Sequence, residues 1–530
     1  MRENENRFQK MIACGLCGLD LCVRMPLPVG VPTTLASFAA DHSIPLLGWL
    51  SRGPNPPLDL ASALPCYAQS VLEVPMSPSW FAALLSLSVP VHAQDADAAP
   101  SPLPGAYGEG VVLLREKQLS PAIEAFARCI DTQPDYAADC RWERGWAHWM
   151  NGDWGKVVAD WEAVRAADPG REGLSRYLAQ AQDNLGLEAL LAKGRSAAPS
   201  TFQSNVPAGT TLRLRAVGDL MISTDFPAGK INPEINATFS DVSEWLADAD
   251  ITFGNLEGPV CDSGKTTKCK PDSKPGSCYA FRTPSKYMPL YQKAGFDVMS
   301  TANNHAGDFG PSCRIETEGH LDALGIAHTG RPGDIATVEA NGLKVAFIGF
   351  HTSRNSHYVN DHEKAELLVR AVDQEHDLVV VSFHGGAEGS KALHVPEGRE
   401  TFYGENRGEL RVFTHTVIDA GADLVLGHGP HVLRGMEVYN DRLIAYSLGN
   451  FATYGRFNLS GNLGIGAVLE VVMDTEGRFV GGKILPTKQQ GEGVPVQDPS
   501  GKAVDLVRTL SADDFPGSAV KVAQDGGLAK

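Results

Sequence analysis

Residues 422–431, which read Ala-Asp-Leu-Val-Leu-Gly-His-Gly-Pro-His, decide the fold class of this chain. The first half is an apolar run that is typical of a buried strand, and the run ends at a glycine. The turn after it carries His428 and His431, and imidazoles are common ligands of zinc, manganese and iron. Glycine next to them lets the backbone come close to a metal ion. Taken alone, the pair could also be two histidines on a surface turn.

Four other polar motifs also stand directly after apolar runs. Sites in α/β sheets form where strands pass into loops at their carboxyl ends, so we expect these motifs to meet. Singly, each has an ordinary explanation: Asp219 could cap a helix, and His384 could be a hydrogen-bonded core histidine. Together they supply the carboxylates, amide and imidazoles of a metal site. The runs and motifs are 212–217 before Gly218-Asp219, 250–253 before Gly254-Asn255-Leu256-Glu257, 296–300 before Asn303-Asn304-His305, and 378–383 before His384-Gly385-Gly386.

In this order the motifs resemble those of the CapA family of capsule and poly-γ-glutamate synthesis proteins, within the calcineurin-like metallophosphoesterase superfamily. The resemblance covers about residues 212–515. It implies an α/β fold, a four-layer αββα sandwich of two mixed sheets. It also implies a centre of two divalent metal ions, which would be manganese, iron or zinc. The motifs that carry it are GD (218–219), NLE (255–257), NNH (303–305), HGG (384–386), GHGPH (427–431) and SLGNF (447–451).

The resemblance assigns roles to individual residues. His305 matches the histidine that usually protonates the leaving oxygen. The superfamily normally has a histidine where this chain has Met221, and Glu257 replaces the usual bridging aspartate. One metal position is therefore short of a nitrogen ligand, which leaves catalysis open. The residues that match metal ligands are Asp219, Glu257, Asn304, His384, His428 and His431.

Other residues near the motifs could support the site. Arg434, the second candidate catalytic residue, could bind a phosphate or carboxylate with two hydrogen bonds. Ser447 and Asn450 could orient the ligand histidines, although a turn after a strand explains them equally well. Glu405 and Arg407 could also bind an anion, but we expect them to pair with each other at the surface.

Length and charge limit the possible functions. The chain has 530 residues, enough for two or more domains, and a net charge of −17. Without a basic run, this charge argues against nucleic acid as a partner. An acidic polymer such as polyglutamate would also be repelled, unless local arginines or metal ions bind it.

Residues 76–93 resemble a secretory signal, with an apolar core and a small-residue cleavage site at Val91-His92-Ala93. The core is too short for a comfortable membrane span, which needs about 20 residues. We interpret residues 1–75 as a spurious or disordered extension before a start at Met76, and 94–104 as a linker. The predicted location is therefore periplasmic or at the cell surface. In the alternative, a cytosolic enzyme, the same segment is a buried helix.

Six cysteines follow this segment, and an even number in an exported chain predicts disulfides. Cys129 and Cys140 form an obvious short pair. The other four have no zinc-like spacing and are expected to form two bridges that pin loops near the site, with the connectivity left open. They are Cys261, Cys269, Cys278 and Cys313.

Residues 105–193 are expected to form a helical module that resembles tetratricopeptide repeats. Two repeats are expected, followed by a further helix over about 175–193. Residues 194–210 are predicted to form a second linker. A metallophosphoesterase-like domain is expected at 211–515 and a tail at 516–530. Its tryptophans fit a core better than a ligand platform, although such modules commonly bind partner proteins. The repeat rests on pairs that stand 35 residues apart: Gly110 and Gly145, Phe126 and Trp161, and Pro134 and Pro169.

Two functions from different classes remain. The first is an exported metal-dependent hydrolase that cleaves a phosphoester or an amide in an envelope polymer, which His305 and the ligand set favour. The second is a non-catalytic accessory protein with a structural or polymer-binding metal site, whose helical module recruits a synthase or export partner. Met221 and the module favour the second function.

Overall fold

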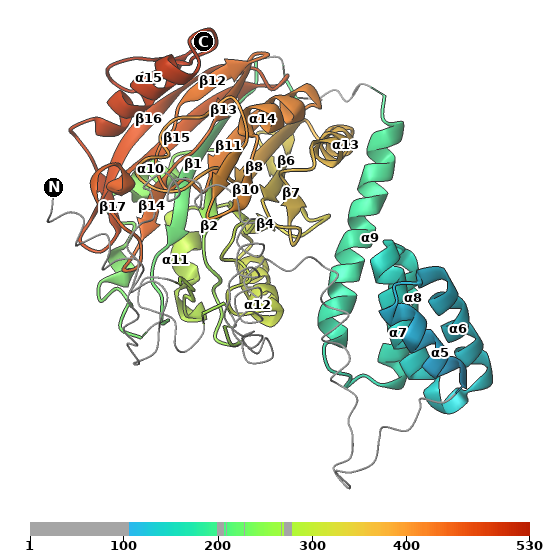
Figure 1. The fold of residues 1–530 in the computed structure, drawn as a ribbon. Helices are drawn as coiled ribbons and strands as arrows, with labels where there is room; N and C mark the ends of the chain where they lie inside the picture. Colours follow the sequence, from blue (N-terminus) through green and yellow to red (C-terminus); the bar gives the residue numbers. More distant parts are fainter. Residues whose placement is uncertain (1–104, 199–205, 208, 227, 267, 270–277) are drawn as a thin grey trace, which may run out of the picture. The chain divides into compact units, whose positions relative to one another are not determined.

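The computed structural model describes residues 105–530, apart from 199–205, 208, 227, 267 and 270–277 (Figure 1). It shows a mixed α/β fold with parallel and antiparallel strand pairs and an N-terminal helical region. The expected extension, signal-like segment and first linker lie outside the described residues. Among the helices in this described part, none has the length and apolar character needed to cross a membrane.

The helical region contains two helix pairs followed by one long helix. Equivalent positions of the predicted repeats make equivalent contacts: a Cβ at Gly110 would lie 2.6 Å from the Phe126 ring, and one at Gly145 would clash with the Trp161 indole. The expected tryptophan core is confirmed for Trp142 and Trp146, which are buried, whereas Trp149 and Trp154 are only partly buried. The tetratricopeptide type stays a prediction. The helices are α5 (Gly105–Arg115), α6 (Leu119–Thr132), α7 (Ala137–Asn151), α8 (Trp154–Ala167) and α9 (Leu174–Ser196).

A ten-stranded mixed sheet follows, in the order β18-β19-β16-β15-β1-β2-β3-β4, with β14 beside β1 and β17 beside β16. β1 pairs in parallel with β2 and β14 and antiparallel with β15. The strands are β1 (Thr211–Met221), β2 (Ile251–Leu256), β3 (Val298–Ser300), β4 (Ala327–Thr329), β14 (Asn450–Thr453), β15 (Ile465–Asp474), β16 (Phe479–Gln490), β17 (Val494–Gln497), β18 (Lys521–Val522) and β19 (Gly527–Ala529).

A seven-stranded sheet has the order β12-β13-β11-β8-β6-β5, with β7 beside β6. Its centre is parallel, since β6, β8, β11 and β13 run in one direction. A small hairpin of β9 (Glu400–Phe402) and β10 (Glu405–Gly408) stands apart from both sheets. The strands of the sheet are β5 (Ile335–Ala340), β6 (Leu343–His351), β7 (His357–Tyr358), β8 (Leu378–His384), β11 (Leu424–His428), β12 (Met436–Tyr439) and β13 (Arg442–Ala445).

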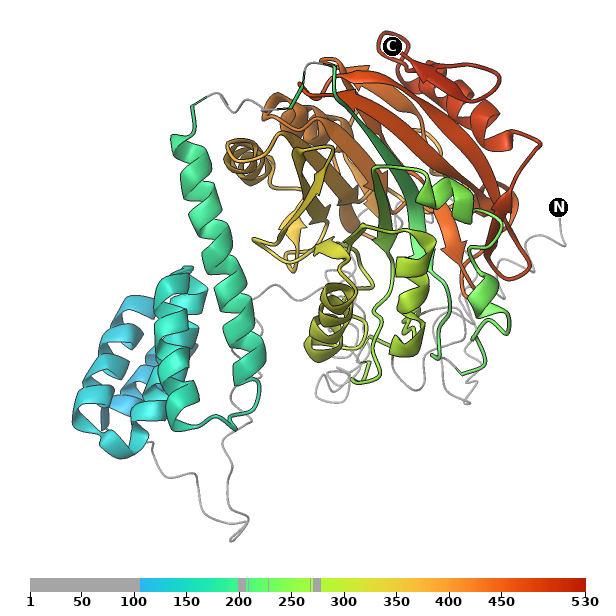
Figure 2. The ribbon, with the colours of Figure 1, turned by 180° about the vertical axis from the view of Figure 1, so that it is seen from behind.

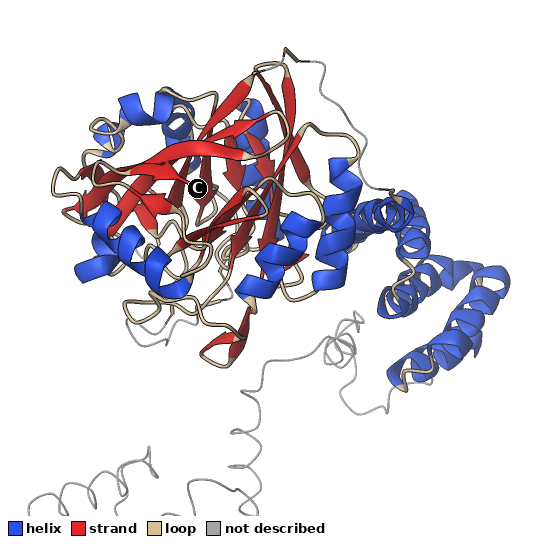
Figure 3. Ribbon diagram, turned by 90° about the horizontal axis from the view of Figure 1, so that it is seen from above, coloured by secondary structure: helices blue, strands red, loops and turns tan. Residues whose placement is uncertain are grey.

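Apolar side chains of the two sheets share one core. The rings of Phe253 on β2 and Phe347 on β6 stack there with centroids 5.7 Å apart. Helices cover the other faces (Figures 2 and 3), although a calcineurin-like four-layer sandwich stays a prediction. The helices are α10 (Ser243–Ala247), α11 (Pro289–Ala294) and α12 (Pro311–Ala323) on the ten-stranded sheet, α13 (His362–Asp373) and α14 (Leu410–Asp419) on the seven-stranded sheet, and α15 (Lys502–Asp514).

Residues 516–530, expected to form a tail, instead complete the ten-stranded sheet. β19 pairs with β16, where Leu528 lies opposite Gly482, and Leu528 is buried. Strands of two and three residues are too short to show any alternation of apolar and polar side chains, so β18 and β19 could not be predicted from a periodic pattern.

Candidate metal centre

The centre lies where strands of both sheets end. In the ten-stranded sheet, Asp219 on β1 is in register with Asn255 on β2 and Asn450 on β14. In the seven-stranded sheet, His384 on β8 is in register with His351 on β6 and His428 on β11. The predicted strands are thereby confirmed, because β1, β2, β3, β8 and β11 coincide with the apolar runs read from the sequence.

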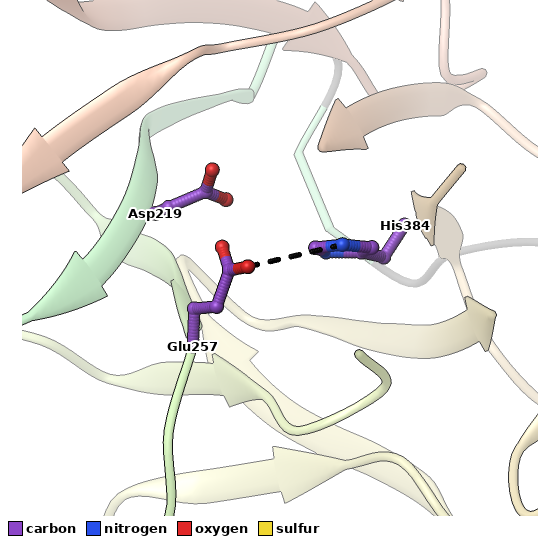
Figure 4. A group of neighbouring side chains, drawn as sticks. All are labelled: Asp219, Glu257 and His384. Atoms are coloured by element: carbon purple, nitrogen blue, oxygen red, sulfur yellow. Dashed lines mark ion pairs between the residues drawn. The ribbon is translucent and has the colours of Figure 1, made fainter. Parts of the chain in front are cut away.

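Three of the predicted ligands form a compact buried group. The ligand atoms of Asp219, Glu257 and His384 all lie within 4.8 Å of one another. Figure 4 shows these three side chains directed toward one another. Nε2 of His384 is 3.9 Å from Oε1 of Glu257. Two carboxylates and an imidazole at this spacing are a plausible donor set for a divalent metal.

The GHGPH turn adds its two histidines to this group. Nδ1 of His431 is 2.9 Å from Oδ2 of Asp219, and its Nε2 is 3.8 Å from Oε1 of Glu257. His428 places Nδ1 3.6 Å from Oδ1 of Asp219. His431 has a φ of 60°, in the left-handed region that non-glycine residues rarely adopt. A turn that holds a strained histidine against two carboxylates is typical of a functional site.

Several ligand atoms are buried without a hydrogen-bond partner among the described residues. Burying a polar atom without a partner is unfavourable, so such atoms in one place indicate a missing ligand. Divalent cations would satisfy the carboxylate oxygens of Glu257 and one ring nitrogen of each histidine, so the residues present fit a metal. The atoms are both carboxylate oxygens of Glu257, Oδ1 of Asn304, Nε2 of His384, and both ring nitrogens of His428.

The electrostatics of the group agree with metal binding. Burial raises the pKa of Glu257 well above its usual range, and the charge of Asp219 adds to the effect. Burial would also raise the pKa of Asp219, but its interactions with His428 and His431 hold that pKa well below the usual range. Burial lowers the pKa of His384, as does the nearby His351. A neutral imidazole, the form that binds metal ions, is therefore favoured at His384.

His305 forms a buried pair with a carboxylate that the sequence analysis missed. Its Nδ1 lies 2.7 Å from Oδ2 of Asp308, and Nζ of Lys268 donates to Oδ1 of Asp308 at 2.7 Å. The His305 ring packs on Phe281 with centroids 4.2 Å apart. Burial lowers the pKa of His305, and Asp308 opposes that shift. Asp308 stands three positions after His305, and this spacing was the signal available in the sequence.

An asparagine pair supports the centre and was also missed. Nδ2 of Asn255 donates to Oδ1 of Asp219 at 2.8 Å, and Oδ1 of Asn255 accepts from Asn303 at 3.1 Å. Oδ1 of Asn303 then accepts from the backbone N–H of His305 at 3.1 Å. Both asparagines are buried. Asn255 and Asn303 thus connect Asp219 on β1 with the loop that carries His305.

The candidate supporting residues divide into two groups. Oδ1 of Asn450 lies 3.1 Å from Nδ1 of His431, as expected for a residue that orients a ligand. The hydroxyl of Ser447 accepts from the N–H of Gly449 at 3.2 Å, which is the turn role left open by the sequence. Ser447 and Asn450 therefore act differently although they lie in one motif.

The two arginines near the site bind carboxylates of the protein. The fully buried guanidinium of Arg434 donates to both oxygens of Glu400 at 2.8 Å, so it is occupied within the fold. Arg407 lies 3.8 Å from Glu405, the pairing expected from the sequence, and closer to Glu388, at 2.9 Å. Unlike the expected surface pair, Arg407 is buried. Neither Arg434 nor Arg407 presents an unpaired guanidinium to a substrate.

The predicted disulfides are present. Cys129 and Cys140 join α6 to α7, as expected. Cys261 pairs with Cys313, and Cys269 with Cys278. The first of these two ties the loop after Glu257 to the start of α12, and the second closes the insertion beside Lys268. Disulfides are typical of proteins exported to an oxidising compartment.

The family match covers the whole centre. Residues 213–454 match the family described as bacterial capsule synthesis protein PGA_cap. The CapA-type resemblance is thus supported. All six predicted metal ligands and Asn450 fall within the matched residues.

Curated relatives agree with this match. The chain is 28% identical over 260 residues to the capsule biosynthesis protein CapA of Bacillus anthracis, covering 45% of this chain and 59% of that protein. It is 27% identical over 252 residues to the PGA biosynthesis protein CapA of Bacillus subtilis, covering 44% and 61%. A probable polyglutamine synthesis accessory protein of Mycobacterium tuberculosis is 23% identical over 228 residues, covering 38% and 55%. The chain thus spans about three fifths of the length of the two CapA proteins.

Proposed function

We propose that this chain is an exported CapA-like protein in the synthesis or export of a capsule or poly-γ-glutamate-type envelope polymer. The family match and the names of the relatives support the role. The disulfides support export. In this proposal, residues 211–530 form a calcineurin-like domain that hydrolyses a phosphoester or an amide with two divalent ions.

One observation carries the hydrolase proposal: buried ligand atoms from both sheets, without hydrogen-bond partners among the described residues, converge at one edge. Asp219, Glu257 and His384, with His428 and His431, would hold divalent ions there, and the bound ions would supply Lewis-acid chemistry for hydrolysis. Asp219 and Glu257 provide the negative charge that offsets the charge of the ions. Asn255 and Asn450 fix the orientation of Asp219 and His431 through hydrogen bonds of 2.8 and 3.1 Å.

The proposed proton donor is His305. Because Nδ1 faces Asp308 at 2.7 Å, Nε2 is the nitrogen that delivers a proton to the leaving group. The carboxylate of Asp308 stabilises the doubly protonated imidazole, whereas burial opposes it. Lys268 holds Asp308 in place from the other side.

A non-catalytic accessory function is the second candidate. Met221 offers no nitrogen where the superfamily has a histidine, and its side chain is buried. In this case the metal site is structural or binds the polymer, and the helical module at 105–193 recruits a synthase or export partner. The name of the mycobacterial relative, an accessory protein, favours this candidate.

Metal stoichiometry of the purified full-length chain tests the proposal first. We expect two ions in the unmutated protein and one or none in His431→Ala. His394→Ala is the matched control, because His394 is exposed and pairs with Asp514 outside the centre. One ion or none in the unmutated protein would favour the accessory function.

The hydrolase step needs a second test. The two-ion protein is assayed with a phosphoester and a γ-glutamyl amide, beside His305→Ala. We expect the variant to keep its metal content and lose hydrolysis. Activity that persists in His305→Ala would show that this histidine is not the proton donor.

A further inference from the structure

An aromatic wall of Tyr279, Phe281 and Phe457 lies beside the metal centre. The Phe281 ring packs on His305 at 4.2 Å, and the Phe457 ring lies 5.2 Å from that of His431. The rings of Phe281 and Phe457 are 5.1 Å apart, and Tyr279 extends the wall at 6.5 Å from Phe281. Tyr279 is 43% exposed, so the wall runs from the buried histidines to solvent.

The guanidinium of Arg456 lies on the outer part of this wall. Its Cζ is 5.3 Å from the centre of the Tyr279 ring, a cation–π distance. Its Nε is buried, yet within the described part of the chain it donates no hydrogen bond, and no carboxylate there forms an ion pair with Arg456. Acidic residues outnumber lysine and arginine by 63 to 46 in this chain, and Arg456 is the arginine that lies on the aromatic wall beside the candidate centre. Arg434 and Arg407, by contrast, are paired.

The loop that carries Arg456 is fixed to the end of β1. The backbone N–H of Tyr454 donates to the carbonyl of Met221 at 2.8 Å. The N–H of Gly455 donates to the carbonyl of Glu492 at 2.6 Å. The backbone directly before Arg456 is therefore held by the end of β1 and by Glu492.

We propose that Arg456 anchors the substrate by binding an oxyanion, a carboxylate or a phosphate, at the mouth of the metal centre. A planar guanidinium binds either group with two parallel hydrogen bonds. The aromatic wall would pack against the apolar part of the same substrate. This anchor rests on the proposed function, and it supplies the local cation that a chain of net charge −17 needs to hold an acidic polymer.

Binding measurements on the metal-loaded full-length protein test the anchor without requiring turnover. The probes are a γ-linked triglutamate, the same peptide with α-carboxamides in place of its α-carboxylates, and inorganic phosphate, each titrated by calorimetry. We expect Arg456→Gln to weaken an oxyanion probe about tenfold, the effect of losing a charged hydrogen-bond pair. Arg456→Lys should recover part of the loss, because it keeps the charge without the paired geometry.

A matched control is Arg176→Gln. Arg176 also lies over a tyrosine, Tyr177, at 4.2 Å, but on α9 of the helical module. Arg176→Gln should bind all probes with the affinity of the unmutated protein. All variants should keep the metal content of the unmutated protein. Weakening of triglutamate alone identifies a carboxylate site, and weakening of phosphate as well identifies a general oxyanion site.

Two results would overturn the anchor: unmutated protein that binds neither oxyanion probe, or Arg456→Gln that binds both as tightly as the unmutated protein. The anchor and the hydrolase fail separately. If probe binding depends on Arg456 but no hydrolysis is found, only the hydrolase proposal is wrong. If hydrolysis is found but probe binding does not depend on Arg456, only the anchor proposal is wrong.

Discussion

The side-chain amide of Asn255 donates a hydrogen bond to Oδ1 of Asp219 at 2.8 Å. The two residues lie in register on the neighbouring parallel strands β1 and β2, and both are fully buried. The bond leaves Oδ2 of Asp219 directed at His431, 2.9 Å away. Asn255 therefore fixes the orientation of Asp219, a candidate metal ligand.

Replacing Asn255 with alanine should weaken metal binding by roughly 10–100-fold, the usual effect of losing a residue that orients a ligand. Metal affinity is measured by competition with a chromophoric chelator. Asn151→Ala is the control, since Asn151 is exposed at the end of α7. Unchanged affinity in Asn255→Ala would mean that Asp219 is oriented by other contacts.

Asp308→Asn should lower the pKa of His305 further. Burial already lowers it, and the carboxylate of Asp308 is the main opposing influence. The protonated form of His305 would then be lost at a lower pH than in the unmutated protein. An NMR titration of the His305 ring proton measures the shift, and metal analysis shows whether the centre stays intact. An unchanged titration would argue against a functional pair.

The disulfides should stabilise the fold according to the length of chain they close. Cys261–Cys313 spans 52 residues and Cys269–Cys278 spans 9. Loop-closure entropy predicts that the free energy of unfolding falls by about 4 kcal/mol without the first disulfide and by about 2.5 kcal/mol without the second, when both of its cysteines become serine. Denaturant unfolding of the two double variants gives the comparison. Equal losses would mean that native contacts, rather than loop entropy, dominate.

The sequence was sufficient to predict the group of candidate ligands Asp219, Glu257 and His384, because each follows an apolar run. Their positions at strand ends therefore predict that Asp219, Glu257 and His384 meet at one edge, without any knowledge of tertiary contacts. The supporting residues gave no such signal. Asn255 and Asn303 meet only through the pairing of β2 with β3, and a hydrogen bond across strands depends on a register that no single segment specifies.

Arg434 shows a second limit. Its position three residues after His431 suggested an anion-binding role, but its guanidinium is taken by Glu400, 34 residues earlier. Glu400 belongs to the small β9–β10 hairpin, whose place against the GHGPH turn follows from loop packing. Whether a charged residue is paired or free thus depends on tertiary contacts that motifs do not encode. The disulfides, by contrast, could be predicted as a set, because an even number of cysteines is read from the sequence without any knowledge of tertiary contacts.

Stability of the helical module should fall as the pH rises. Burial raises the pKa of Glu143 from 4.5 to about 7, and Asp139 adds to the shift while Arg171 and Arg115 oppose it. The folded module then binds a proton that the unfolded chain has released, so this stability is fully present below pH 4.5 and lost as the pH rises toward about 7. Tryptophan fluorescence during thermal melting reports on the module, because α7 and α8 carry most of the tryptophans.

Glu143→Gln should therefore melt above the unmutated protein at pH values higher than about 7, and match it below pH 4.5. The amide keeps the shape of the side chain without the charge. Glu124→Gln on α6 is an exposed control and should show no pH-dependent difference. If the melting temperatures of Glu143→Gln and the unmutated protein differ by the same amount at both pH values, titration of Glu143 is not the cause.

The glycine and aromatic pairs of the helical module make the sharpest packing prediction. A Cβ at Gly145 would meet the indole of Trp161, which is fully buried. Gly145→Ala must displace that ring, and overpacking of this kind costs about 1–3 kcal/mol. Gly186, inside α9, has nothing within 4 Å of the equivalent position. Gly186→Ala should instead stabilise the protein by about 0.5–1 kcal/mol, because alanine is the better helix former.

The two variants make the same chemical change in helix interiors, so their opposite signs isolate the contact with Trp161. Denaturant unfolding, followed by the tryptophan fluorescence, measures both free energies of unfolding. If Gly145→Ala is as stable as Gly186→Ala, the close approach of α7 and α8 at this pair does not limit the size of the residue. The same contact geometry at Gly110 and Phe126 predicts that Gly110→Ala destabilises as well, since a Cβ there would lie 2.6 Å from the ring.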